Sequence, residues 1–92
     1  MADKQREHIR FTGYVQGVGF RYRLSHLAQH YGVTGWVRNE YDGSVSAELQ
    51  GLPEEIAQII QQLKQDRYID ITGMDRKNIP PDEQENGFHI RY

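Results

Sequence analysis

The sequence predicts a two-layer α+β fold in which two helices cover one face of a mainly antiparallel sheet. In several short segments the apolar residues alternate with polar ones, as in strands with one buried face. In two others they recur every three or four residues, as in helices with one apolar face. The segments follow the order β-α-β-β-α-β with one further short strand, which is the order of the ferredoxin-like sandwich.

The first strand and helix are predicted from a change of period. Residues 8–15 alternate, with Ile9 and Phe11 on one side of the strand. The pattern breaks at residues 16–19, and Gly32 is a natural left-handed end for the helix that follows. That helix has one apolar face, formed by Phe20, Leu24, Leu27, Ala28 and Tyr31.

The remaining elements follow from turn and helix-start signals. Asp42-Gly43 is typical of a hairpin, and Pro53 fits the first turn of a helix. Ile56, Ile59, Ile60 and Leu63 would form the buried stripe of this second helix. The strands expected after the first cover residues 35–39, 45–49, 68–77 and 88–92. We expect a single domain over residues 8–92, preceded by a flexible tail of residues 1–7.

Composition limits the function. The 92 residues include no cysteine, which excludes a thiolate nucleophile and a cysteine-bound zinc. A net charge of −2 argues against a general nucleic-acid-binding surface. No segment resembles a membrane span or a signal peptide, so we expect no membrane partner and a cytoplasmic location. A single small domain without an obvious extra apolar face predicts a monomer.

The most unusual stretch is GYVQGVGFRYR, residues 13–23, where the strand gives way to the helix. The helix start has no Ser, Thr, Asp or Asn to cap its free N–H groups, and glycines let a ligand approach the backbone closely. Such a start can hold an anion, and Arg21 adds a forked cation suited to phosphate. The alternative is a tight turn with a surface arginine. Neither the P-loop nor the dinucleotide-binding pattern matches.

Asn39 is the second candidate, at the end of the segment GWVRN. Its amide can donate and accept hydrogen bonds at once, so it could hold a water; a turn asparagine bonded to its own backbone is the alternative. His26 and His30 are four residues apart but lie opposite the apolar helix face, which indicates a solvated surface. His8 and His89 stand in opposite terminal strands and could be neighbours in the sheet. No carboxylate is spaced so as to make them a convincing site.

Together, GYVQGVGFR, GWVRNEYDGSVSAELQG and the C-terminal FHIRY resemble the acylphosphatase family. The resemblance implies hydrolysis of the carboxyl-phosphate bond of a small-molecule acyl phosphate, with no cofactor or metal. It implies that Arg21 binds the phosphate and that Asn39 orients the attacking water. The backbone cradle for the phosphate would be formed by Val15, Gln16, Gly17, Val18, Gly19 and Phe20. Ser46 and the segment DRYIDI depart from the family pattern, outside these motifs.

Two other functions remain as alternatives. A phosphate- or nucleotide-binding module without activity would bind the ligand and turn nothing over. An RNA-binding domain of the same fold would carry aromatic motifs on its central strands, which RFTGYVQG does not match. The family resemblance favours the enzyme. Few catalytic residues would suffice for its reaction, because a carboxylate leaving group has a conjugate acid with a pKa of about 4 and needs no general acid at neutral pH.

Overall fold

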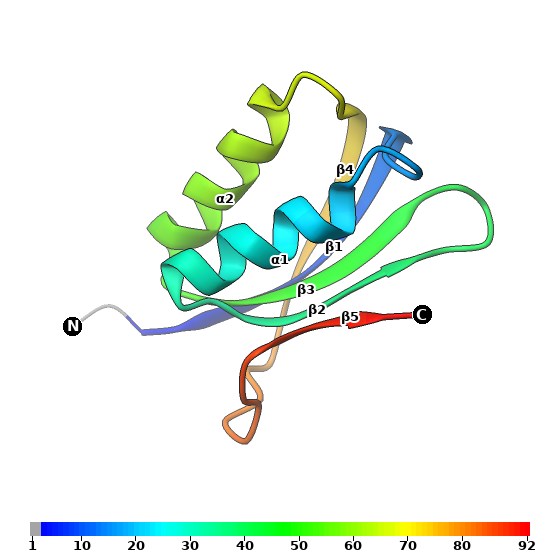
Figure 1. Cartoon of the computed structure of the whole chain (residues 1–92). Helices are drawn as coiled ribbons and strands as arrows, with labels where there is room; N and C mark the ends of the chain where they lie inside the picture. Colours follow the sequence, from blue (N-terminus) through cyan, green and yellow to red (C-terminus); the bar gives the residue numbers. More distant parts are fainter. Residues whose placement is uncertain (1–2) are drawn as a thin grey trace.

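The computed structural model describes residues 3–92 and has the predicted order of elements. Both helices lie on the same side of a five-stranded sheet (Figure 1). The elements are β1 (Gln5–Tyr14), α1 (Phe20–Tyr31), β2 (Thr34–Asn39), β3 (Val45–Gly51), α2 (Pro53–Gln65), β4 (Asp70–Ile79) and β5 (Phe88–Arg91). The ferredoxin-like fold predicted from the sequence is confirmed.

The strand order β4-β1-β3-β2-β5 decides which elements meet. The pairs β1–β3, β1–β4 and β2–β3 are antiparallel, and β5 lies parallel to β2 at the edge of the sheet. The apolar sides of the strands and the stripes of both helices form one core between the two layers. None of the helices described in residues 3–92 is long and apolar enough to cross a membrane.

The predicted N-terminal tail is too long. β1 begins at Gln5, and both Arg6 and Glu7 are buried. Arg6 donates two hydrogen bonds to the Glu85 carboxylate, at 2.7 and 3.0 Å, and a third to Glu48 at 3.0 Å. These partners lie far along the chain, which explains why the local pattern of polar residues was misleading. Residues 1 and 2 of the predicted tail lie outside the described residues.

The fourth strand is shifted relative to its prediction, because the chain makes a turn before entering it. Asp66 accepts a hydrogen bond from the backbone N–H of Tyr68 at 2.9 Å, and this turn delays the strand to Asp70. Pairing with β1 then continues to Ile79. Ser46, one of the departures from the family pattern, is paired with Arg38 on the sheet face away from the helices.

Candidate active site

The loop between β1 and α1 has the backbone conformation that an anion cradle needs. Gly17 and Gly19 have φ angles of 74° and 81°, in the left-handed region that favours glycine. Gly19 is the N-cap of α1 and makes no side-chain capping bond. The first backbone bond of the helix runs from the N–H of Arg23 to the carbonyl of Gly19, at 2.9 Å.

The N–H groups before that bond are free. Among residues 3–92, no hydrogen bond is donated by the backbone N–H groups of residues 16–22. A helix N-terminus concentrates free donors and a partial positive charge, which together favour an anion. The loop thus offers the donors that the sequence predicted for it.

Gln16 fixes this loop to the hairpin between β2 and β3. Its side-chain amide donates to the carbonyls of Glu40 and Ser44, at 2.8 Å each. Because Asn39 is the last residue of β2, these two bonds hold the loop and Asn39 in one arrangement.

The same hairpin is held by its acidic turn. Asp42 accepts hydrogen bonds from the hydroxyl and the backbone N–H of Ser44, at 2.6 and 3.0 Å, and it also pairs with Arg10. The bonds from Ser44, together with Arg10, hold the pKa of the Asp42 carboxyl well below its usual range. The carboxylate therefore stays ionised at acid pH values where an ordinary aspartate takes up a proton, and its bonds to the turn persist there.

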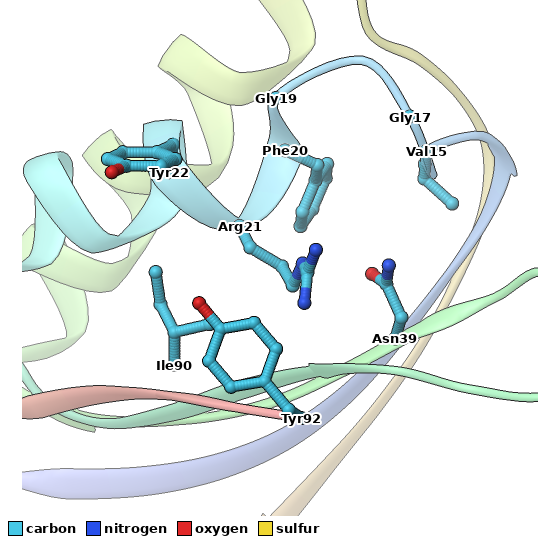
Figure 2. Close-up of a pocket in the computed structure, with 9 residues that line it drawn as sticks. All are labelled: Val15, Gly17, Gly19, Phe20, Arg21, Tyr22, Asn39, Ile90 and Tyr92. Atoms are coloured by element: carbon cyan, nitrogen blue, oxygen red, sulfur yellow. The ribbon is translucent and has the colours of Figure 1, made fainter.

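Arg21 and Asn39 face one pocket of about 120 Å³, several times the roughly 30 Å³ that one water occupies in the liquid. Arg21 reaches it from α1 and Asn39 from β2, with the two side chains pointing toward one another below the loop (Figure 2). Within residues 3–92 Arg21 pairs with no carboxylate; its guanidinium carbon lies 5.1 Å from the centre of the Tyr92 ring. The side-chain oxygen of Asn39 is buried and has no hydrogen-bond partner in this part of the chain.

An unpartnered buried amide oxygen is costly, so its presence beside a pocket indicates that a ligand or water supplies the missing donor. The pocket therefore combines three features: free backbone donors, an uncommitted arginine and an amide oxygen able to accept from water. Such a set can hold a phosphate group and a water side by side.

Six of the eight predicted site residues line this pocket: Val15, Gly17, Gly19, Phe20, Arg21 and Asn39. Gln16 and Val18 do not, because the first turns its side chain to the hairpin and the second packs against the core. Sequence reasoning missed three further lining residues, Tyr22, Ile90 and Tyr92. Phe88, Ile90 and Tyr92 are two residues apart, so in a strand they lie on the same face. Because Phe88 is apolar, this spacing could have placed Ile90 and Tyr92 on the helix face of the sheet.

The other histidines do not belong to the site. His26 and His30 are exposed on α1, as predicted. His8 and His89 are not neighbours, because β3 and β2 separate their strands. The residues that the structure describes contain no group of three or more His, Cys, Asp or Glu side chains able to hold a metal ion.

Known proteins resemble this chain along nearly its whole length. The acylphosphatase family model matches residues 7–90. An acylphosphatase of Bifidobacterium longum is 40% identical over 92 residues, covering 98% of this chain and 95% of the relative. One from a Synechococcus strain is 36% identical, covering 99% and 97%. The crystal structure of acylphosphatase from Bacillus subtilis superposes with a TM-score of 0.87 at 28% identity, covering 96% of this chain and 99% of that one. The chain therefore belongs to the acylphosphatase family and is a hydrolase with acylphosphatase activity.

Proposed function

We propose that Arg21 and the free N–H groups of the β1–α1 loop bind the phosphate of an acyl phosphate, and that Asn39 orients the attacking water. One observation carries the proposal: the guanidinium of Arg21 and the unpartnered oxygen of Asn39 share one pocket. Arginine presents two parallel donors to phosphate oxygens, which suits binding and stabilises charge as it develops.

The reaction consumes one water and gives a carboxylate and inorganic phosphate. The water donates a hydrogen bond to Asn39 and attacks phosphorus, while the bond from phosphorus to the acyl oxygen breaks. The carboxylate leaves with its electron pair and needs no proton at neutral pH. Within the described residues the pocket lining contains no carboxylate or imidazole, so the proton of the water passes to a phosphoryl oxygen. Positioning and electrostatic stabilisation then account for the catalysis.

The test separates the two roles by comparing turnover with phosphate affinity. Benzoyl phosphate hydrolysis is followed by ultraviolet absorbance with EDTA present, and inorganic phosphate serves as a competitive inhibitor. Arg21→Ala is expected to remove most activity and to weaken inhibition by phosphate. Asn39→Ala is expected to lower kcat while inhibition by phosphate changes little.

Asn78→Ala provides the matched control, because Asn78 is exposed on β4 and lies outside the pocket. Equal loss of turnover and phosphate affinity in Asn39→Ala would assign Asn39 a structural role instead. Phosphate binding without turnover by the folded wild-type protein would indicate a binding module.

We also propose that the enzyme is a monomer. The edge strand β4 exposes the charged side chains of Asp75, Arg76 and Lys77, which discourage the addition of another strand. The opposite edge, β5, has only 4 residues. Size-exclusion chromatography with light scattering should give the mass of one chain, 10.8 kDa, and a concentration-independent dimer mass would contradict this. A cytoplasmic location stays a prediction from the sequence.

A further inference from the structure

The catalytic pocket has a second side that phosphate binding does not use. Gly17, Gly19, Arg21 and Asn39 supply its polar groups, and the rest of the lining includes Tyr22, Ile90 and Tyr92. In Figure 2 Tyr22 and Ile90 lie on the side of Arg21 that faces away from Asn39. The backbone of Tyr92 follows β5 beside the end of β2, and its ring points toward Ile90. These three residues come from the first turn of α1 and from the C-terminal end of the chain, at and just beyond β5.

The geometry of phosphoryl transfer tells which part of the substrate reaches this side. The attacking and leaving oxygens lie roughly in line through phosphorus. If the water lies at Asn39, the acyl group leaves in the direction away from Asn39. That direction leads from the polar groups toward the two tyrosine rings and Ile90.

Both rings are mostly exposed, although the centre of the Tyr22 ring lies 6.0 Å from that of the His26 ring. Tyr22 is 71% exposed and Tyr92 is 96% exposed, although each lines the pocket. Covering a water-exposed ring with a flat apolar group lowers the free energy of the complex. When that group is itself aromatic, the pair is stabilised by more than the buried area alone accounts for. The centre of the Tyr92 ring lies 5.1 Å from the guanidinium carbon of Arg21. This is the one aromatic or cation–ring contact that Tyr92 makes within residues 3–92.

The charge around this side favours an uncharged acyl group. Arg23 is the next cation along α1, but it is 43% exposed and its Nε lies 3.6 Å from the Asp66 carboxylate. Arg23 lines a neighbouring hollow with Tyr22 and His26, where Asp66 pairs with it, rather than the pocket around Arg21. Among residues 3–92, Arg21 is therefore the one cation in the lining of that pocket.

We propose that Tyr22, Ile90 and Tyr92 form an acyl subsite that selects aromatic or bulky apolar acyl phosphates over small ones. This inference rests on the proposed function, because it takes Asn39 as the position of the water. Tyr22 and Tyr92 act as specificity-determining residues, and Tyr92 also restrains the Arg21 guanidinium.

The experiment compares two substrates that share the phosphate and differ in the acyl group, benzoyl phosphate and acetyl phosphate. The measured quantity is kcat/KM for benzoyl phosphate divided by kcat/KM for acetyl phosphate. This ratio is normalised to that of the wild type. Any change in phosphate binding or in Arg21 affects both substrates and cancels in this ratio. Tyr22→Ala suits the test, because alanine favours the helix and the replaced side chain is mostly exposed.

Tyr22→Ala is expected to lower the ratio roughly two- to tenfold, the range that one lost aromatic contact gives. Tyr22→Phe should keep the wild-type ratio, since the ring is retained. Tyr41→Ala is the matched control, because Tyr41 is fully exposed in the β2–β3 hairpin and lies outside the pocket.

An unchanged ratio in both Tyr22→Ala and Tyr92→Leu would overturn the subsite, even if the enzyme stayed fully active. The same ratio change in Tyr41→Ala would also overturn it. If Asn39→Ala left kcat unchanged for both substrates, this would instead contradict the proposed function.

Discussion

Replacing Arg21 by lysine keeps the positive charge and removes the forked pair of donors. A point ammonium can make one good contact to a phosphate oxygen where the planar guanidinium makes two. In the structure Arg21 is half-buried and has no carboxylate partner within residues 3–92, so its donors are available to the substrate. Arg21→Lys therefore removes about one charge-assisted hydrogen bond.

The size of the effect follows from that count. A hydrogen bond to a charged group contributes about 1.5–3 kcal/mol. Because 1.36 kcal/mol corresponds to tenfold in rate, kcat/KM should fall roughly 10- to 150-fold. The assay is benzoyl phosphate hydrolysis followed by ultraviolet absorbance, with inhibition by inorganic phosphate measured alongside it.

Arg23→Lys is the matched control in the same helical turn. The Arg23 side chain is 43% exposed and lies near Asp66, at 3.6 Å, rather than in the pocket. It should retain kcat/KM within about twofold, as expected for a surface pair of small energetic weight. Near-full activity of Arg21→Lys, or an equal loss in Arg23→Lys, would refute forked binding by Arg21.

Two further predictions concern the loop and the open face of the sheet. Gln16→Ala removes two hydrogen bonds of 2.8 Å and should lower kcat/KM about tenfold, with the exposed Gln61→Ala as control; unchanged activity would contradict the anchoring role. Burial is the largest single effect on the pKa of Glu48 and raises it, but the hydrogen bonds from His8 and Arg6 and the charge of Arg6 together lower this pKa from its ordinary 4.5. The unfolded state then binds more protons, so this stability is present above pH 4.5 and is lost as the pH falls below it. In denaturant unfolding, the free energy of unfolding of Glu48→Gln should fall less steeply below pH 4.5 than that of the wild type. The same pH dependence in both proteins would contradict this.

The sequence predicted those parts of the molecule that depend on local chemistry. The left-handed end of α1 at Gly32, its uncapped start at Gly19 and the position of Asn39 before a hairpin each follow from a few neighbouring residues. Such features are set by backbone conformation and by which side chains are missing, and both are visible in a single segment.

The parts that escaped prediction depend on the order of strands. Arg6 is buried because Glu85, 79 residues further along the chain, folds back against it. Tyr92 enters the pocket because β5 lies parallel to β2 and so places the chain end beside Asn39. No local pattern gives either contact, since each requires the sheet order and the path of the β4–β5 connection.

The strand order also explains how so few side chains can form the site. β1 ends at the loop, α1 begins with Arg21 one residue inside it, and β2 ends at Asn39, so the ends of three elements meet at one end of the sheet. In the proposed site most of the donors are backbone N–H groups held in place by the helix, and such donors need no reorganisation during a reaction. A carboxylate leaving group removes the need for an acid, and the fold has to supply only charge, donors and one positioned water. A phosphate cradle with exposed donors requires glycine and no capping side chain, and the proposed binding role of the loop accounts for the missing cap at the start of α1.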